Sequence, residues 1–224
     1  MDYYKSKVNL VSVTPNAEKQ IVDLARVSNT SGSSSGSDEK LIQYMIRHGH
    51  WSPFEMAHMT VEIFTTRDIS RQILRHRSFS FQEFSQRYAE VAFRRSGVIK
   101  EARAPHPTNR QASLPTIDAD TQEWWMVIQL RLQERAELAY AQALRRGIAK
   151  ECARVILPEG LTETRLYMSG NVRSWIHYIE LRFGNGTQQE HQDVAGQVAT
   201  IFSKHFPAIW KAIEFRTGMK ETQK

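Results

Sequence analysis

The chain has 224 residues, of which 41% are hydrophobic, and it carries a formal net charge of +6. This length predicts one domain with one sizeable core, and the absence of any run of about 18 apolar residues excludes a membrane-spanning helix. The single cysteine, Cys152, excludes an internal disulfide framework; together with residues 1–13, which lack the apolar core of a secretory signal, it favours the cytoplasm.

Arginine outnumbers lysine by 20 to 10. General solubility would be served at least as well by lysine, whereas the planar guanidinium binds phosphate or carboxylate through two bonds at a time. Discrete anionic ligands therefore explain the bias better than a diffuse charge role does. Charge alone leaves a nucleic-acid-binding module open as an alternative.

The first 66 residues predict two strands and two helices. Residues 58–66 alternate in the manner of a half-buried strand, with His58, Thr60, Glu62 and Phe64 opposite Met59, Val61, Ile63 and Thr65. The elements in chain order are a strand at 8–14, a helix at 16–28, a flexible low-complexity loop at 29–39, a helix at 38–50 and the strand at 58–66. The first helix has Ile21, Leu24 and Ala25 inward. The second ends near Gly49 and has Leu41, Tyr44 and Met45 at helical spacing.

The next helix is expected over residues 69–77, with Asp68 as its cap. Arg67, Arg71 and Arg75 are spaced to form one ridge, while Ile69 and Ile73 form another that faces the core. Exposed like charges at this spacing repel by about 0.2–0.5 kcal/mol per pair, so the ridge needs acidic partners or a bound anion. A solvated basic face is the plain alternative.

The second half of the chain predicts mainly helices. Residues 95–118 form a long loop with three prolines, the kind that often serves as a lid or binding loop. The elements that follow are a helix at 120–146, a short helix at 149–157 before Pro158, a strand or extended turn at 162–170, and helices at 171–182 and 187–206. Asp120 with Glu123 caps the helix at 120–146, which ends at Gly147. Its apolar residues at helical spacing form one ridge: Trp125, Ile128, Leu132, Ala136, Ala139 and Ala143. The whole predicts an α+β fold: one helix-rich domain over 1–224 with a small, mainly antiparallel sheet.

The segment RHRSFSFQEFSQRY, residues 75–88, combines arginines, hydroxyls, amides and one carboxylate. Serine and glutamine beside arginine suit phosphate and sugar hydroxyls, and glutamine or glutamate suits a base edge. The aromatic residues Phe79, Phe81, Phe84 and Tyr88 either anchor the segment in the core or stack on a planar ring.

This segment resembles the signature of flavin-dependent thymidylate synthases. That signature reads Arg-His-Arg, two free positions, Ser, one free, Asn-Glu, one free, Ser, one free, Arg-Tyr. Gln82 departs from it, since the usual residue there is Asn. The matching positions are Arg75, His76, Arg77, Ser80, Glu83, Ser85, Arg87 and Tyr88. Three further segments are similar to the family: RHGHWSPFE (47–55), AKECARVILP (149–158) and NVRSWIHYIELR (171–182).

The resemblance implies synthesis of dTMP from dUMP. Methylenetetrahydrofolate would donate the carbon, reduced FAD would supply the hydride, NADPH would reduce the flavin, and no metal would be needed. The implied FAD contacts are Ser52, Arg75, His76, Arg77, Glu83, Asn171, Val172, Arg173 and His177. The implied dUMP contacts are Gln72, Ile73, Leu74, Arg75, Glu83, Phe84, Ser85, Gln86, Arg87, Arg154 and Arg182.

Arg182 is the residue to which the resemblance gives the catalytic role. A guanidinium beside the uracil ring stabilises the negative charge that develops when the ring loses its N3 proton or accepts hydride. Ser85 lacks a neighbouring base in sequence, so a hydrogen bond to phosphate is favoured over a nucleophilic role.

Arg173 and Arg182 lie nine positions apart, which is about 180° around an ideal helix. If the helix is regular, the two arginines cannot point into one pocket of one subunit. They can serve two copies of a site formed between subunits, in agreement with the tetramers of the resembled family. We therefore expect a homotetramer with shared active sites, and neither a membrane nor a nucleic-acid partner.

Other interpretations of single residues are weaker. Cys152 is expected in or near the core, because no base accompanies it and a free cysteine packs as a small hydrophobe. His48, His50 and His58 match no common zinc spacing. The tryptophans Trp124, Trp125, Trp175 and Trp210 are expected in core or interface packing. Besides a nucleic-acid module, a flavoprotein of the same fold with another substrate stays an alternative.

Overall fold

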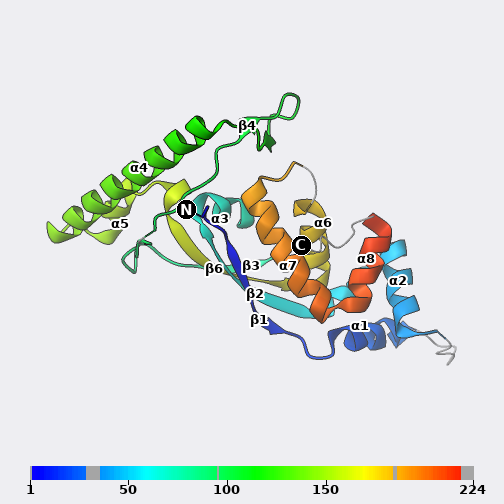
Figure 1. Cartoon of the computed structure of the whole chain (residues 1–224). Helices are drawn as coiled ribbons and strands as arrows, with labels where there is room; N and C mark the ends of the chain where they lie inside the picture. The colour runs from blue at the N-terminus through cyan, green and yellow to red at the C-terminus, as the bar shows by residue number, and fades with distance from the viewer. Residues whose placement is uncertain (1, 29–35, 95, 184–185, 218–224) are drawn as a thin grey trace.

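The computed structural model describes residues 2–28, 36–94, 96–183 and 186–217 (Figure 1). Most of the loop predicted at 29–39 lies outside these residues. None of the described helices is both long and apolar enough to cross a bilayer.

A four-stranded antiparallel sheet lies at the centre of the fold, as predicted. Its order is β1 (Lys7–Val13), β2 (His58–Thr66), β6 (Glu163–Asn171) and β3 (Ser80–Glu83). The strands predicted at 8–14, 58–66 and 162–170 are confirmed. The edge strand β3 lies inside the signature segment, where the sequence pattern predicts no strand; it pairs with β6 so that Ser80 is opposite Ser169.

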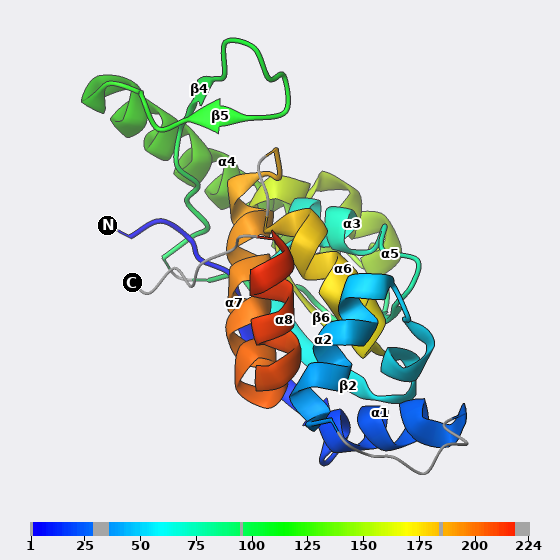
Figure 2. The ribbon, with the colours of Figure 1, turned by 90° about the vertical axis from the view of Figure 1, so that its right-hand side faces the viewer.

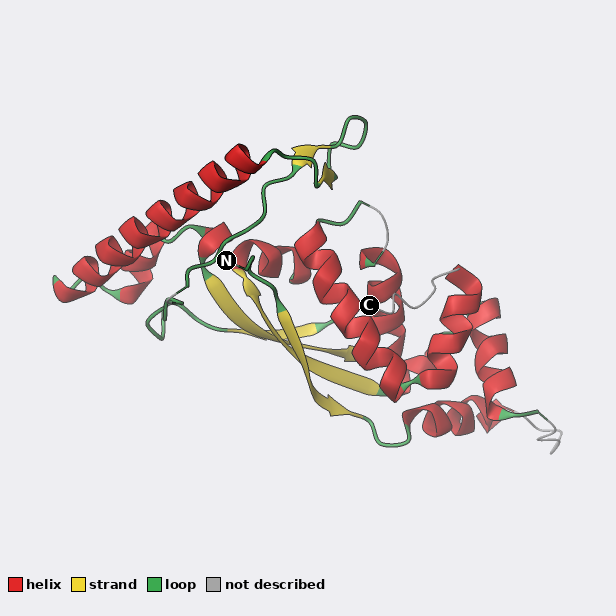
Figure 3. Cartoon of the chain, viewed as in Figure 1, coloured by secondary structure: helices red, strands yellow, loops and turns green. Residues whose placement is uncertain are grey.

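Helices cover one face of this sheet (Figures 1 and 3). α6 (Val172–Arg182) and α7 (Gln189–His205) pack there, and α1 (Ala17–Ala25), α2 (Asp38–His48) and α8 (Pro207–Thr217) lie farther out, with α8 beside α2 (Figure 2). The sequence pattern predicts no element after Pro207. The shared core comprises Met59, Val61, Ile63, Leu166 and Met168 from the sheet and Trp175, Ile179, Val194, Val198 and Phe202 from the helices. Each such side chain stabilises the fold by about 1.5–3 kcal/mol when fully buried.

Local signals explain where two of these helices begin or end. Asn171 caps α6, because its side-chain oxygen accepts a hydrogen bond of 2.8 Å from the backbone N–H of Ser174. Gly49 ends α2 in the left-handed conformation, at φ 69°, as predicted. Leu24, expected to face inward, is 42% exposed, because the core lies over the Ile21 side of its helix. On α2, Met45 is buried but Tyr44, at helical spacing with it, is 50% exposed.

The arginine helix α3 is shorter than predicted and spans Arg67–Ile73. Thr66 precedes it, and Asp68 lies in its first turn instead of capping it, where it pairs with Lys100 at 2.7 Å. Arg75 lies beyond the end of α3, because the chain turns there toward β3. The predicted ridge of three arginines is therefore not formed.

Helix α4 (Ala119–Arg145) projects from the body of the molecule (Figure 1). Its cap is Asp118, whose carboxylate accepts from the backbone N–H of Thr121 at 2.8 Å, so the predicted capping pair of Asp120 and Glu123 is wrong. The predicted apolar ridge is not buried either: Leu132 is 52% exposed. The buried residues of α4 are instead Gln129, Gln133 and Tyr140.

Three glutamines of α4 hold the segment 98–102 in an extended conformation. Gln133, Gln129 and Gln122 each accept a hydrogen bond from the backbone N–H, and donate one to the backbone C=O, of Val98, Lys100 and Ala102 respectively. The side-chain amides thus take the place of a neighbouring strand. We call these three residues the glutamine ladder. Beyond it the loop forms a small hairpin of β4 (Ala104–Pro105) and β5 (Ser113–Leu114).

The helix predicted at 149–157 is reduced to one turn, α5 (Lys150–Ala153), followed by a 3₁₀ turn at Arg154–Ile156. Cys152 is exposed, contrary to the expected core position, because the turn buries Ala153 and Leu157 instead. Three further 3₁₀ turns occur at Arg26–Ser28, Ser52–Met56 and Glu159–Leu161.

Candidate active site

Arg182 in the last turn of α6 contacts His76 in the turn after α3. Its Nε donates a hydrogen bond of 2.9 Å to Nε2 of His76. Burial, together with the charge of Arg182, lowers the pKa of His76 from 6.5 to about 4. His76 is therefore neutral at pH 7 and carries its proton on Nδ1, since Nε2 is the acceptor.

A second histidine, His191 of α7, lies fully buried beside this pair. Its Nε2 is 3.2 Å from the hydroxyl of Tyr178, and its Nδ1 is 3.3 Å from Oε1 of Gln72. Burial and the nearby Arg182 and His76 lower the pKa of His191 to about 3. The predicted ligand contacts Gln72, His76 and Arg182 thus meet around a histidine that sequence reasoning missed. The only signal was a histidine in line with the apolar Val194 and Val198.

Glu83 is fixed by three groups on one of its carboxylate oxygens. Oε1 accepts from Ser70 Oγ at 2.7 Å and from Thr164 Oγ1 at 2.9 Å, and it lies 3.6 Å from Nη1 of Arg67. Burial lowers the pKa of Arg67, and Glu83 opposes that shift. Glu83 is therefore anchored to α3 and β6, while its second oxygen takes part in none of these contacts.

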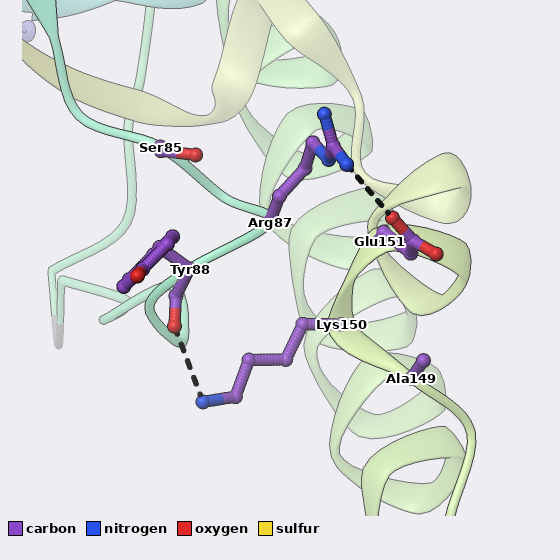
Figure 4. A pocket seen from close by; sticks show the side chains of 6 residues that line it. All are labelled: Ser85, Arg87, Tyr88, Ala149, Lys150 and Glu151. Atoms are coloured by element: carbon purple, nitrogen blue, oxygen red, sulfur yellow. Dashed lines mark hydrogen bonds and ion pairs between the residues drawn. The ribbon is translucent and has the colours of Figure 1, made fainter.

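A cavity of about 540 Å³ lies between the end of the signature segment and α5 (Figure 4). Arg87 reaches across it to Glu151 at 3.3 Å, and Nζ of Lys150 is 3.5 Å from the carbonyl oxygen of Tyr88. The lining residues are Ser85, Arg87, Tyr88, Ala149, Lys150 and Glu151. The lining thus holds two cations and two hydroxyl-bearing side chains against the single carboxylate of Glu151, and an anionic group could take the place of that carboxylate beside Arg87.

Gln86 follows Ser85 and is only 5% exposed. Its Nε2 is the one buried side-chain nitrogen or oxygen of the described residues that has no hydrogen-bond partner. An unpaired buried donor costs about 1–3 kcal/mol. Such an atom points to a ligand that supplies the missing acceptor.

The start of α6 gathers a different group of predicted residues. Arg173 forms an ion pair with Glu55, and the rings of His177 and Trp51 lie 4.8 Å apart. Ser52 is exposed in the adjacent 3₁₀ turn. Arg173 thus pairs with Glu55, whereas Arg182, nine residues along the same helix, bonds His76.

The remaining predicted residues differ in how their side chains lie. Ile73 and Val172 are fully buried in the core, so only their backbone can face a ligand. Phe79 and Phe81 pack on the core, Phe84 packs on the cluster beneath α4, and Tyr88 is 89% exposed. Leu74 packs against the core, and Arg154 Nε bonds the carbonyl oxygen of Glu151.

Several of the predicted site arginines have no carboxylate partner within the described residues: Arg75, Arg77, Arg154 and Arg182. By contrast, Arg67 and Arg71, the other members of the expected ridge, pair with Glu83 and Glu159. Arg182 contacts the neutral His76, which Arg75 and Arg77 flank in the sequence, and guanidinium groups without acidic partners are suited to phosphorylated ligands. No group of three or more histidine, cysteine, aspartate or glutamate residues in the described part of the chain is placed to hold a metal ion.

Comparison with known proteins identifies the class. The family model described as "Thymidylate synthase complementing protein" matches residues 9–208. The "Probable flavin-dependent thymidylate synthase" of Paramecium bursaria Chlorella virus 1 is 49% identical over 214 residues, covering 92% of this chain and 98% of that protein. The "Flavin-dependent thymidylate synthase" of Synechocystis sp. is 49% identical over 198 residues, covering 88% of this chain and 90% of its own.

A solved structure has the same fold. It is the crystal structure of a UMP/dUMP methylase, PolB from Streptomyces cacaoi, bound with 5-Br dUMP; it is 28% identical, with a TM-score of 0.84, covering 99% of this chain and 100% of that one. A second structure of that protein contains 5-Br UMP. The chain therefore belongs to the thymidylate synthase complementing protein family. The enzyme class predicted from the signature, a flavin-dependent thymidylate synthase, is confirmed.

Proposed function

We propose that the protein, acting as a single domain over its whole length, converts dUMP to dTMP by reductive methylation. Methylenetetrahydrofolate would donate the carbon, and FAD reduced by NADPH would be the hydride source. The observation that carries this proposal is the meeting of Gln72, His76 and Arg182 beside cations that have no carboxylate partner among the described residues. Family membership supports the reaction class.

The side chains expected to hold FAD fit an anionic dinucleotide. Arg75 and Arg77 are exposed and lack acidic partners among the described residues, so both can bind phosphate. When bound, the flavin supplies the hydride. The residues proposed to hold it are Ser52, Arg75, His76, Arg77, Glu83, Asn171, Val172, Arg173 and His177, with Val172 contributing through its backbone alone.

The residues proposed to hold dUMP come from four places in the fold. Gln72, Ile73, Leu74 and Arg75 come from α3 and its end, Glu83, Phe84, Ser85, Gln86 and Arg87 from β3 and the following turn, and Arg154 and Arg182 from two separate helical segments. The unpaired Nε2 of Gln86 supports a ligand acceptor at this point. The cavity lined by Ser85 and Arg87 supports a phosphate position.

Arg182 is proposed to polarise or activate the uracil ring. The Nε–H of Arg182 donates its hydrogen bond to His76, so the Nη1 and Nη2 groups of Arg182 remain available to the nucleotide. A neutral His76 orients the guanidinium without neutralising it. Its positive charge can therefore stabilise negative charge on the pyrimidine in a partly buried site, where the interaction is stronger than in water.

The active protein is proposed to be a homotetramer with shared sites. Arg173 pairs with Glu55 and Arg182 bonds His76, and these different partners support the expectation, from their nine-residue spacing, that the two arginines serve different sites. Apolar residues such as Leu132, Leu138 and Val155 are exposed in the single chain, which supports burial against further copies. Sedimentation of the active protein as about four chains is expected, and an active monomer would contradict shared sites.

The visible absorbance spectrum of the purified protein, recorded before and during titration with dUMP and separately with UMP, tests the function. Flavin bands that shift on adding dUMP are expected. A flavin-containing protein that responds to neither nucleotide would instead favour a flavoprotein with another substrate. A colourless protein that takes up no added FAD would contradict the proposal, and nucleic-acid binding as a function of salt would be measured next.

A further inference from the structure

A chain of side-chain hydrogen bonds connects the long loop after the signature segment with Gln72. Arg103 donates from Nη2 to Oε1 of Glu190 at 2.7 Å. Oε2 of Glu190 accepts from Nε2 of Gln188 at 2.9 Å, and Oε1 of Gln188 accepts from Nε2 of Gln72 at 2.6 Å. Oε1 of Gln72 then lies 3.3 Å from Nδ1 of His191. Apart from Gln72, the sequence-based site contains none of these residues.

The ion pair at the start of this chain is well enclosed. The side chains of Arg103 and Glu190 are 12% and 14% exposed. Arg103 also donates from Nε to Ser113 Oγ at 2.9 Å, which connects the pair with β5. Although burial raises the pKa of Glu190, its hydrogen bonds with Arg103 and Gln188 lower it below the ordinary value overall. Glu190 is therefore an anion that only accepts hydrogen bonds.

An anion at this end fixes the direction of every amide that follows. Gln188 must turn its Nε2 toward Glu190, so its Oε1 faces Gln72. Gln72 must then present Nε2 to Gln188 and Oε1 to His191, which donates from Nδ1. A reversed Gln72 amide would set its oxygen against the oxygen of Gln188, whichever tautomer His191 adopts.

We propose that Arg103, Glu190 and Gln188 are positioning residues that lock the amide of Gln72 in one orientation for the nucleotide. This inference rests on the proposed function, in which Gln72 contacts dUMP. In the locked orientation, the second N–H of Gln72 and one lone pair of its Oε1 remain for the ligand in a fixed order. The loop at 95–118 therefore acts on nucleotide binding through Arg103.

Glu190→Gln tests the lock, because it keeps the shape of the side chain but removes the anion. A glutamine at this position can present either end to Gln188, so both amides lose their enforced direction. We expect dUMP to bind to the FAD-loaded Glu190→Gln protein about tenfold more weakly than to wild type, measured by calorimetric titration. FAD content should be unchanged. Glu62→Gln is the matched control, since Glu62 also pairs with an arginine and its side chain is 15% exposed, but it lies on the sheet.

A double-mutant cycle separates positioning from a general structural effect. Gln72→Ala should weaken dUMP binding, and adding Glu190→Gln in that background should change the affinity less than about twofold, because the residue through which Glu190 acts is gone. Effects that multiply in the double variant would overturn the inference. If Glu190→Gln fails to fold with FAD, Gln188→Met, which breaks the same chain of bonds, is tested in the same cycle with the same expectation.

Wild-type protein that binds no dUMP would overturn both the proposed function and this inference. Wild-type protein that binds dUMP, together with Glu190→Gln and Gln188→Met variants of unchanged affinity, would overturn the inference alone.

Discussion

Arg182 and His76 are 106 residues apart in sequence, yet one hydrogen bond of 2.9 Å joins them, with the arginine as donor. The geometry requires a neutral imidazole, because a protonated ring would turn a second N–H toward the guanidinium. The pair therefore keeps one full positive charge at the end of α6 without a carboxylate partner among the described residues. This relationship bears directly on the catalytic prediction.

Arg182→Ala is expected to retain FAD but to lose thymidylate formation by at least about a hundredfold, as for removal of a single charge-stabilising donor in other active sites. FAD content is measured by absorbance and turnover by product chromatography. Arg145→Ala, at the exposed end of α4, is the control and should behave as wild type. Wild-type turnover in Arg182→Ala would remove Arg182 from the mechanism.

The half-buried His76 and the fully buried His191 should make the fold less stable in acid. Their folded pKa values, about 4 for His76 and about 3 for His191, lie below the unfolded value of 6.5. The unfolded chain therefore binds more protons in this window, and the free energy of unfolding falls as pH drops from about 6.5 toward 4. Each histidine contributes a slope of at most about 1.4 kcal/mol per pH unit.

His191→Asn should reduce that slope, because it removes one titrating group while keeping a donor near the Nδ1 position. Urea unfolding between about pH 4.5 and 7 measures the effect. His205→Asn, an exposed substitution in the same helix, should leave the slope close to that of wild type. Parallel curves for wild type and His191→Asn would contradict the assignment of the slope to His191.

Glu83→Ala should cost about 3–5 kcal/mol of folding free energy, because it leaves the buried Arg67 without its anion. Ser70→Ala removes only one of the hydrogen bonds to Glu83 and should cost about 1 kcal/mol. Both values come from denaturant midpoints. Equal losses for the two variants would show that the unpaired charge of Arg67 is not the main cause of the destabilisation.

Gln133→Leu removes one rung of the glutamine ladder. It leaves the buried N–H and C=O of Val98 unpaired, at a cost of about 1–3 kcal/mol for each group. Faster amide exchange at Val98 is expected in hydrogen-exchange measurements. Gln142→Leu makes the same change at an exposed position of α4 and should leave exchange at Val98 unaltered.

Periodic elements and the signature could be predicted from sequence because both are local. The alternation of residues 58–66 predicts β2, and the offsets of Arg75, His76 and Glu83 indicate the family. Arg75 could not be placed correctly, since the end of α3 depends on how the chain enters β3. The same is true of β3 itself, whose only strand partner among the described residues is β6, far along the sequence.

The residues that hold the site together were missed for a related reason. Gln188 and His191 reach Gln72 across 116 and 119 residues, so no short pattern records these contacts. On α4 the pattern favours Leu132 as a core residue, but the structure buries Gln129 and Gln133. Their partners are backbone groups of an extended segment, and hydropathy does not register such partners.

The direction of α6 makes its two arginines unequal. The aligned peptide dipoles of a helix place partial positive charge at its beginning and partial negative charge at its end, an effect of about 0.3–1 kcal/mol on a charged side chain. Arg173 lies in the unfavourable first turn, where Glu55 offsets it. Arg182 lies in the last turn, where the helix itself stabilises the cation. The macrodipole thus stabilises Arg182, which has no carboxylate partner among the described residues, and the positive field of Arg182 acts on whatever binds beside it.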